Sequence, residues 1–563
     1  MNIWKQVKQQ LAAELNQQLE KDIIKPGDFI LTPDASLGDL ALPLFVLAKD
    51  LQTSPAKLAI DLAANWNSDW CQAEAAGAYL NFRLSTEWNK EVLANIETGE
   101  NERIGEGQEV MIEYSNANTH KEYHLGHLRN ISYGDAMGRL YRAAGFKVWP
   151  VSYINDFGIH VAKTIWALKR GFVPMTEDAS ADKGFLLGQA YVEAVKQLEI
   201  LPEGPAEVSQ IMQNIEARTG EDYDLWTTTR QWSLDYFASI YQELKIEFAE
   251  HYYESEYIEA GRALVDELLK KGILRESQGA IIADLEEYGL GVLVVLRADG
   301  TALYPVADLA LAQEKFRRHE LTKSLYVVDV RQSLYFKQLF KVLELMGYRA
   351  EMAHLPYDFV KLPSGMMSSR TGNTISYRDL YLKVFEKFKN EIADRHVDWD
   401  EDQMIETARI LTVATLKFEM LKVGADKVIC FDVDEALRFD GFTASYLEYV
   451  AARINSVLSK SGLETSAILS AGGDLSQALE SRLVAKLAQF EEKIEQSAQA
   501  ANPSELAKYL YELAQLFNDY YQTVPLLVDD SGLRAVRMRL LLNIRTILQN
   551  GLELLGIEIV RQM

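Results

Sequence analysis

The sequence of 563 residues is poor in cysteine, with only Cys71 and Cys430, and it has no apolar run long enough to cross a bilayer. Two thiols exclude a disulfide framework and a zinc site built from several thiolates. The apolar stretch Gly291–Leu296 is far shorter than the roughly 20 residues that a membrane helix needs. We therefore expect a cytoplasmic protein that does not enter a membrane.

Basic residues are also scarce, since 58 Lys and Arg stand against 82 Asp and Glu, a formal net charge of −24. Bulk charge of this sign argues against nucleic acid as a partner, because phosphate contacts need Lys and Arg. A large acidic protein can nevertheless carry a local basic surface, so the partner class stays open. The length predicts two to four domains.

The middle of the chain alternates strand and helix patterns. The run Glu109–Ser115 reads as a buried strand, a helix pattern follows up to Gly145, and a second strand begins at Lys147. Such a βαβ unit binds ligands at the carboxyl ends of its strands. Mostly helical patterns fill residues 160–275. We place three later strand patterns in the second half of the same sheet: "GAIIADL", "GVLVVLRADGTALY" and "SLYVVDV".

Three of the eight histidines fall within "NTHKEYHLGHLR", residues 118–129. A metal site has little support, because no cysteine and no helical zinc motif lie near. Capping or packing at the start of a helix is a second interpretation. In a third, the helix N-terminus and the two imidazoles of His124 and His127 stabilise phosphoryl oxygens, and Gly126 lets a ligand approach the backbone.

A second stretch, "GMMSSRTGN" at residues 365–373, is a glycine-flanked, hydroxyl-rich loop with one cation, Arg370. With it, the pattern resembles class I aminoacyl-tRNA synthetases. The residues His124-Leu125-Gly126-His127 resemble the HIGH signature of that class, and Met367-Ser368-Ser369-Arg370 resemble its KMSKS loop, in the right order. This resemblance favours the phosphate interpretation of the histidines.

Further segments resemble the arginyl-tRNA synthetase family across the whole chain: "EYSNANTHKEYHLGHLR", "DGTALYPVADLA", "YVVDVRQSLYFKQLFKVLELMGY", "GFTASYLEYVAARI" and the closing "LNIRTILQNGLELLGIEIVRQM". The resemblance implies a multidomain protein with an α+β N-terminal domain, a Rossmann-type α/β catalytic domain and an all-α anticodon-binding bundle. We place these domains at residues 1–90, 105–376 and 377–563, with a helical insertion at about 170–275 in the catalytic domain.

The family pattern also implies the residues of the active site. The catalytic set would be His124, His127, Lys121, Ser368, Ser369 and Arg370. ATP would contact His124, Gly126, His127 and Met367. The arginine ligands would be Glu113, Asn118, Tyr304, Asp308 and Gln332. Carboxylates suit this substrate, because a guanidinium is planar and always charged. A packing role for Tyr304 and Gln332, and a helix N-cap role for Asp308, stay open.

The implied reaction joins L-arginine to tRNA(Arg) through an arginyl-adenylate, with ATP and Mg²⁺ but no tightly bound cofactor and no protein-bound metal. We expect a monomer. Some residues depart from the family pattern. Glu122 and Tyr123 replace a Pro and an apolar residue, and Arg370 replaces the second Lys of the loop, for which Lys121 would compensate. Phe442, Ser445 and Glu448 also differ, in the anticodon-binding domain.

Two other functions stay open from the sequence. A nucleotidylyltransferase that uses the same signature is one, although such chains lack the C-terminal helical region. An inactive synthetase paralogue that binds tRNA or senses arginine is the other. Pyrophosphate exchange that is stimulated by tRNA would separate a synthetase from the nucleotidylyltransferase, and the intact His124, Gly126, His127 and Lys121 speak against the inactive paralogue.

Overall fold

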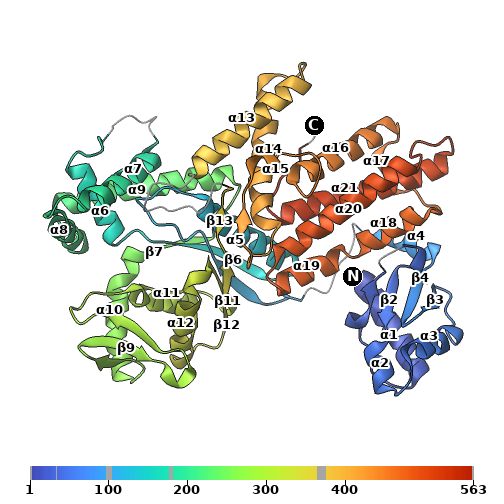
Figure 1. The fold of residues 1–563 in the computed structure, drawn as a ribbon, viewed down its shortest axis with the longest axis horizontal. Helices are drawn as coiled ribbons and strands as arrows, with labels where there is room; N and C mark the ends of the chain where they lie inside the picture. Colours follow the sequence, from blue (N-terminus) through green and yellow to red (C-terminus); the bar gives the residue numbers. More distant parts are fainter. Residues whose placement is uncertain (1–2, 33–34, 97–103, 176–181, 364–375, 561–563) are drawn as a thin grey trace.

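A five-stranded parallel sheet forms the centre of the molecule, in the order β12-β11-β5-β6-β7 (Figure 1). The computed structural model describes residues 3–32, 35–96, 104–175, 182–363 and 376–560. The five strands are β5 (Glu109–Glu113), β6 (Lys147–Ile154), β7 (Glu250–Tyr253), β11 (Leu321–Asp329) and β12 (Glu351–Tyr357). The chain adds β6 and β7 on one side of β5 and adds β11 and β12 on the other side, so the strand order reverses between β5 and β11. Ligands bind at such a switch point, outside the carboxyl ends of the two strands.

The βαβ unit predicted from residues 109 to 154 is present, with α5 (Leu125–Ala143) between β5 and β6. Both strands are largely buried, as is typical of a parallel sheet that is covered on both faces. Glu113 pairs in register with Val151 of β6 and with Tyr326 of β11. The end of β5 therefore lies at the middle of the sheet, directly before the loop that leads to α5.

Two segments predicted as strands are strands, but their placement in the main sheet was wrong. The segments "GAIIADL" and "GVLVVL" form β9 (Ala280–Asp284) and β10 (Val292–Leu296), which pair antiparallel in a separate three-stranded sheet with β8 (Arg275–Ser277). The physical reason is the short connection between them, because parallel neighbours need a crossover of a dozen or more residues. Of the three segments, only "SLYVVDV" joins the main sheet, as part of β11.

Helices α6 (Ile159–Lys169), α7 (Lys183–Leu198), α8 (Gly204–Glu216) and α9 (Gly220–Glu243) pack together at one end of the molecule (Figure 1). They enclose an apolar core of their own, which includes Trp166, Leu187 and Val208. The stretch that we expected to be a helical insertion, about 170–275, also contains strand β7. The chain thus returns to the main sheet at Glu250, before α10 (Glu254–Lys270).

The C-terminal region is helical, as predicted. Its described part, residues 376–560, has seven helices of ten or more residues: α13 (Tyr377–Arg395), α14 (Glu401–Leu421), α16 (Ala444–Lys460), α18 (Ala478–Ala488), α19 (Phe490–Gln499), α20 (Pro503–Thr523) and α21 (Ser531–Leu554). No helix in the described ranges is both long and apolar enough to cross a bilayer.

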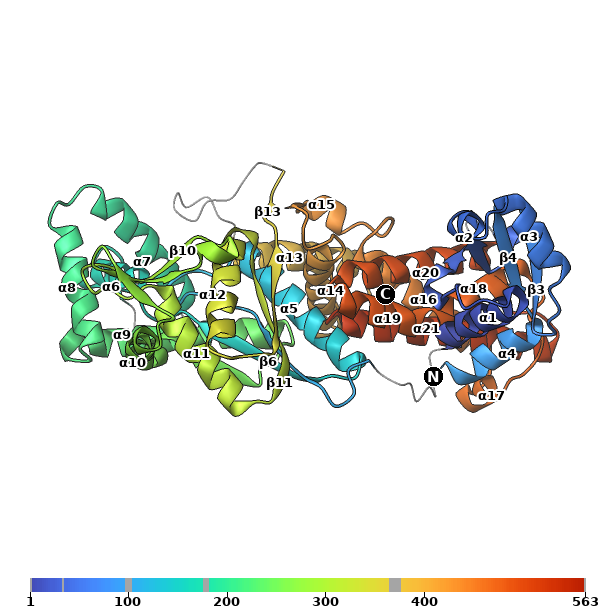
Figure 2. The same ribbon diagram turned by 90° about the horizontal axis from the view of Figure 1, so that it is seen from below.

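The N-terminal region packs against this bundle at the other end of the molecule (Figure 2). It combines a four-stranded antiparallel sheet with helices, in agreement with the predicted α+β class. The strands are β1 (Ile30–Leu31), β2 (Leu40–Pro43), β3 (Cys71–Ala76) and β4 (Tyr79–Leu84), and the helices are α1 (Ile3–Leu19), α2 (Phe45–Asp50), α3 (Pro55–Ala64) and α4 (Thr86–Asn95). The Lys8 ammonium lies 3.0 Å from the Glu492 carboxylate of α19.

Two of the C-terminal residues that depart from the family pattern lie inside the helical bundle. Ser445 and Glu448 of α16 are both fully buried. One carboxylate oxygen of Glu448 accepts a hydrogen bond from the Val560 backbone N–H at 2.9 Å. Burial raises the pKa of Glu448 from its ordinary value of 4.5 to about 8. These two positions therefore contribute to packing and to the electrostatics of the bundle interior.

We predict that Glu448→Gln makes the protein more resistant to alkaline pH. The folded chain holds a proton on Glu448 that the unfolded chain releases above pH 4.5, so stability falls between pH 4.5 and 8. With about 1.4 kcal/mol for each pKa unit, the native protein should lose on the order of 2–3 kcal/mol between pH 6 and pH 9 through this group. Urea unfolding at both pH values measures the loss.

The Gln variant should lose less than the native protein over that range. A matched control is Glu386→Gln, which removes an exposed carboxylate from α13 and should keep the native pH dependence. Equal losses in all three proteins would contradict the assignment of a proton to Glu448.

Candidate active site

A cavity of about 900 Å³ opens at the carboxyl ends of β5 and β11. Every predicted site residue within the described ranges lines it: Glu113, Asn118, Lys121, His124, Gly126, His127, Tyr304, Asp308 and Gln332. The remaining predicted residues, Met367, Ser368, Ser369 and Arg370, lie outside the described residues. The switch point of the sheet thus gathers side chains that are more than 200 positions apart in the sequence.

The two signature histidines begin helix α5 and share one tautomer. The Nδ1 atom of His124 accepts the Gly126 N–H at 3.1 Å, and Nδ1 of His127 accepts the His124 N–H at 3.2 Å. Their rings stack with centroids 3.9 Å apart. Because Nδ1 is an acceptor in both rings, a neutral imidazole carries its hydrogen on Nε2. Capping by Nδ1 and donation by Nε2 are therefore compatible roles for the same residues.

Both rings are uncharged at neutral pH. Burial, reinforced by the nearby Lys121 ammonium, lowers the pKa of His124 to about 4. Burial and His124 lower the pKa of His127 well below its usual range. A Cβ on residue 126 would lie 3.0 Å from the His124 ring, so Gly126 leaves room for that ring. The site can supply hydrogen-bond donors to an anion without titrating between pH 6 and 8.

The residues that flank the histidines tie this loop to its neighbours. The Lys121 ammonium lies over the Tyr191 ring, 4.7 Å from its centroid. Tyr123 is buried with its ring centroid 4.7 Å from that of His127, and its carbonyl accepts the Tyr377 N–H at 2.8 Å. The chain that follows residues 364–375 is therefore bonded directly to the histidine loop. Among the described residues, no group of three His, Cys, Asp or Glu could hold a metal ion.

Glu113 already has a cation as its partner. Its carboxylate forms a buried ion pair with Lys315 of α11 (Tyr304–Arg318), where both side chains are about 95% or more inaccessible to solvent. Burial opposes a charge on Lys315, but the attraction of Glu113 outweighs it and raises the Lys315 pKa. A guanidinium would have to compete with this ammonium, so Glu113 is poorly placed as a free carboxylate ligand.

Asp308 lies in the second turn of α11, which begins at Tyr304, so the N-cap interpretation of Asp308 does not hold. Tyr304 stands one turn earlier on the same helix face and is two-thirds exposed. The Asp308 carboxylate accepts a hydrogen bond from the Tyr335 hydroxyl. Burial raises the Asp308 pKa to about 6, and the negative charge of Glu113 adds to this effect.

A third carboxylate, Glu254, was missed from the sequence. It is the first residue of α10 and is buried, and its Oε2 accepts a hydrogen bond from Asn155 Nδ2 at 3.1 Å. It forms no ion pair with any described residue. Burial and the nearby Asp308 raise its pKa to about 8. The sequence signal that could have identified Glu254 was an acidic residue directly after a strand. Because β7 is short and polar, its sequence does not predict a strand.

Asn118 and Gln332 complete the cavity wall from two different loops. Asn118 forms a parallel bridge with Asn155, the same residue that binds Glu254. Gln332 ends a short 3-10 helix (Val330–Gln332) that directly follows β11. Both amides can bind polar groups of a ligand that lies between the ends of β5 and β11.

Comparisons with known proteins agree with this architecture. The family model described as the catalytic domain of class I tRNA synthetases (R) matches residues 90–428. The model of the arginyl-tRNA synthetase N-terminal domain matches residues 5–84, and that of the DALR anticodon-binding domain matches 447–563. The arginine–tRNA ligase of Bdellovibrio bacteriovorus is 36% identical over 561 residues, which cover 97% of this chain and 95% of the relative.

The chain belongs to the arginyl-tRNA synthetase family. Another relative, the arginine–tRNA ligase of Halothermothrix orenii, is 31% identical over 549 residues, with 95% of each chain covered. The solved structure of the Thermus thermophilus arginyl-tRNA synthetase superposes with a TM-score of 0.81 at 27% identity, with 99% of each chain covered. The three-part fold predicted from sequence is confirmed as that of arginyl-tRNA synthetases.

For this arginyl-tRNA synthetase family member, we predict that changing either signature histidine to Asn separates capping from catalysis. The Asn amide oxygen can take over the acceptor role of Nδ1, but the Nε2 donor is lost. Pyrophosphate exchange should slow by roughly ten-fold to a thousand-fold, the range for loss of one transition-state donor. The melting temperature should stay near the native value.

The corresponding His→Gln variants supply the control, because the longer amide reaches the Nε2 position and should keep more activity than Asn. The exchange rate should also show no histidine titration between pH 6 and 8. Asn variants that keep the full exchange rate would leave the histidines with a capping role only.

Proposed function

We propose that this protein attaches L-arginine to tRNA(Arg) in two steps, with ATP as the energy source. The observation that carries the proposal is a pair of neighbouring acids, Asp308 in the cavity wall and Glu254 close to it, neither of which forms an ion pair with a described residue. Two acids whose ionised forms are disfavoured by burial, and which have no ion-pair partner of their own in the described part of the chain, favour a ligand with a permanent positive charge. Membership in the arginyl-tRNA synthetase family supports the same substrate.

In the first step, a carboxylate oxygen of arginine attacks the α-phosphorus of ATP, and pyrophosphate leaves. His124 and His127 donate from Nε2 to phosphate oxygens whose negative charge grows in the transition state. Lys121 and Arg370 supply positive charge for the phosphates in this proposal, and the other assigned residues of the second signature, Ser368, Ser369 and Met367, take part in binding and activation of ATP. Mg²⁺ enters as the counter-ion of ATP and belongs to the substrate.

The arginine itself is held from two sides in this proposal. Asp308 and Glu254 face the guanidinium, with Tyr304 next to them, while Asn118 and Gln332 hold the α-amino and carboxylate groups. Glu113 acts through Lys315 and not as a direct ligand, which revises the role expected from the family pattern. Neutral Glu254 becomes ionised as the guanidinium arrives.

In the second step, the terminal ribose hydroxyl of the tRNA attacks the adenylate carbonyl, loses its proton, and AMP leaves. As in other class I enzymes that this chain resembles, the 2′-hydroxyl is the proposed acceptor. We assign tRNA contact to residues 1–90, catalysis to 105–376 and anticodon contact to 377–563. The proposal includes a monomer that acts in the cytoplasm, on the basis of the sequence alone.

Exchange of pyrophosphate into ATP across all twenty amino acids, with and without total tRNA, tests this function. Arginine alone among them should support exchange, and lysine should not, because an ammonium cannot engage two carboxylates in a planar fork. A chain that binds arginine or tRNA but exchanges no pyrophosphate would be the inactive paralogue.

We predict that Asp308→Asn and Glu254→Gln each raise the KM for arginine while the KM for ATP stays near the native value. Loss of one partner from a buried charge pair costs on the order of 2–5 kcal/mol. Steady-state exchange measures both constants. Citrulline, which has nearly the shape of arginine but no charge, should not be activated by the native enzyme.

Glu314→Gln is a matched control, because Glu314 is also on α11 but pairs with Arg317 and Arg318 on the surface. Its arginine KM should be native. Glu113→Gln should instead lower the melting temperature, since it leaves Lys315 buried without a partner. Activation of citrulline at a rate similar to that of arginine would refute the carboxylate pair.

A further inference from the structure

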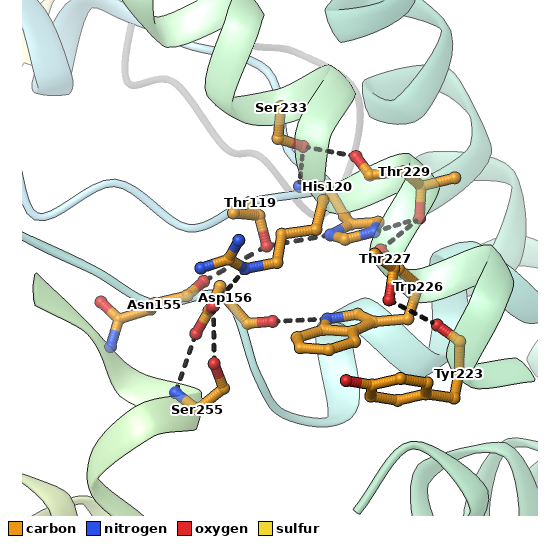
Figure 3. Close-up of polar contacts among 11 residues, drawn as sticks. Thr119, His120, Asn155, Asp156, Tyr223, Trp226, Thr227, Thr229, Ser233 and Ser255 are labelled. Carbon is orange, nitrogen blue, oxygen red and sulfur yellow. Dashed lines mark hydrogen bonds and ion pairs between the residues drawn. The ribbon is translucent and has the colours of Figure 1, made fainter. Parts of the chain in front are cut away.

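One face of α9, in the helical insertion, is bonded to two of the loops that carry cavity residues, the loop after β5 and the loop after β6 (Figure 3). Its members are Trp226, Thr229, Arg230 and Ser233, which follow the spacing of one helix face. Ser233 Oγ accepts the His120 N–H at 2.9 Å, and the His120 ring lies 2.8 Å from Thr229 Oγ1. These contacts fix the loop before the signature histidines.

The other two members bind Asp156, in the second loop. Asp156 has no solvent exposure. Its Oδ2 accepts from Arg230 Nε at 2.5 Å, and its backbone carbonyl accepts from Trp226 Nε1 at 2.9 Å. The Arg230 guanidinium also lies over the Tyr253 ring, 4.2 Å from its centroid. Arg230 therefore holds both the loop after β6 and the residue that precedes α10.

Asp156 also caps helix α10 from outside that helix. Its Oδ1 accepts the Ser255 N–H at 2.9 Å, and its Oδ2 accepts the Ser255 hydroxyl at 2.8 Å (Figure 3). Tyr253, the N-cap residue of α10, supplies no side-chain cap of its own. A carboxylate at a helix N-terminus satisfies free N–H groups and is favoured by the helix dipole. The start of α10 thus depends on Asp156.

Glu254, the acid that our proposed function assigns to the guanidinium, lies between Tyr253, which contacts Arg230, and Ser255, which binds Asp156. It is the first residue of α10, directly before Ser255. Asn155, directly before Asp156, binds Glu254 through its side chain and exchanges backbone hydrogen bonds with Ala117 and Thr119. A shift of Asp156 would therefore move Glu254 together with Asn155, which lines the cavity.

We propose that Arg230, through its ion pair with Asp156, positions Glu254 and Asn155 for arginine, so that the helical insertion sets how tightly the amino acid is bound. The inference rests on the proposed function. Arg230 is a positioning residue, because none of its described contacts is with a residue that lines the cavity. Its effect reaches the substrate through Asp156, Ser255 and the first turn of α10.

The charge of Arg230 and its positioning of the α10 N-terminus predict opposite changes in the arginine KM when Arg230 is replaced by Met. Removal of a cation next to Asp156 makes the field around Glu254 more negative, and this would favour a cationic substrate and lower the arginine KM. Loss of positioning lets the α10 N-terminus move and raises the same constant. The sign of the change therefore separates the two effects.

The test measures aminoacylation of tRNA(Arg) by the full chain at saturating tRNA, with arginine and ATP varied in turn. Arg230→Met should raise the arginine KM by roughly ten-fold or more, as expected for a broken buried pair. The ATP KM should stay within about two-fold to three-fold of native, since the histidine loop keeps its own contacts with α9. Arg230→Lys, which can still pair with Asp156, should recover part of the loss.

Thr227→Val is the matched control on the same helix, because the hydrogen bond that the Thr227 hydroxyl makes among the described residues is to the Tyr223 carbonyl of α9 itself. It should leave both constants unchanged. If Arg230→Met does not fold, Ser255→Ala decides, because it removes one hydrogen bond to Asp156 and should still raise the arginine KM selectively.

An arginine KM for Arg230→Met that is unchanged or lower than native would overturn the inference. An equal rise of both constants would also overturn it, since that pattern indicates general damage. In either case native enzyme that charges tRNA with arginine leaves the proposed function intact, whereas native enzyme without that activity removes the function itself.

Discussion

The buried ion pair between Glu113 and Lys315 joins the end of the central strand β5 to the middle of helix α11. It decides two features of the cavity at once. It holds α11, and with it Tyr304 and Asp308, against the switch point of the sheet. It also neutralises Glu113, so that the neighbouring acids Asp308 and Glu254 are left for a cationic substrate in the proposed function. A buried ion pair contributes little net stability in general, and its value here lies in this positioning.

The sequence was informative where chemistry depends on local spacing. The Nδ1 contacts of His124 and His127 follow from two rings three positions apart at a helix start, and every described candidate lines one cavity. The partner of Glu113 was not predictable, because Lys315 is 202 positions away. Glu254 was missed because β7 is a short, polar edge strand whose identity comes from pairing with β6. Short apolar runs such as Val292–Leu296 indicate a strand but not which sheet it joins.

The helical insertion has an apolar core of its own, yet its helix α9 contributes a polar face to the catalytic domain. Apolar packing tolerates small rearrangements, whereas hydrogen bonds to the buried Asp156 and His120 permit few geometries. The polar contacts of α9 therefore couple the position of the insertion to the positions of two loops of the active site. The residues on the far side of the second signature, Ser376 and Tyr377, are bonded to the same histidine loop.

The central claim is that Asp308 and Glu254, which form no ion pair with a described residue, bind the cationic group of the substrate. Calorimetric titration of arginine into the full chain at pH 7, in buffers of different ionisation enthalpy, tests it directly. Glu254, with a pKa of about 8, is mostly protonated in the free protein, and a guanidinium beside it favours the ionised form. The account predicts release of about one proton for each arginine bound, and no release in Glu254→Gln. Arginine binding without proton release in the native protein would contradict it.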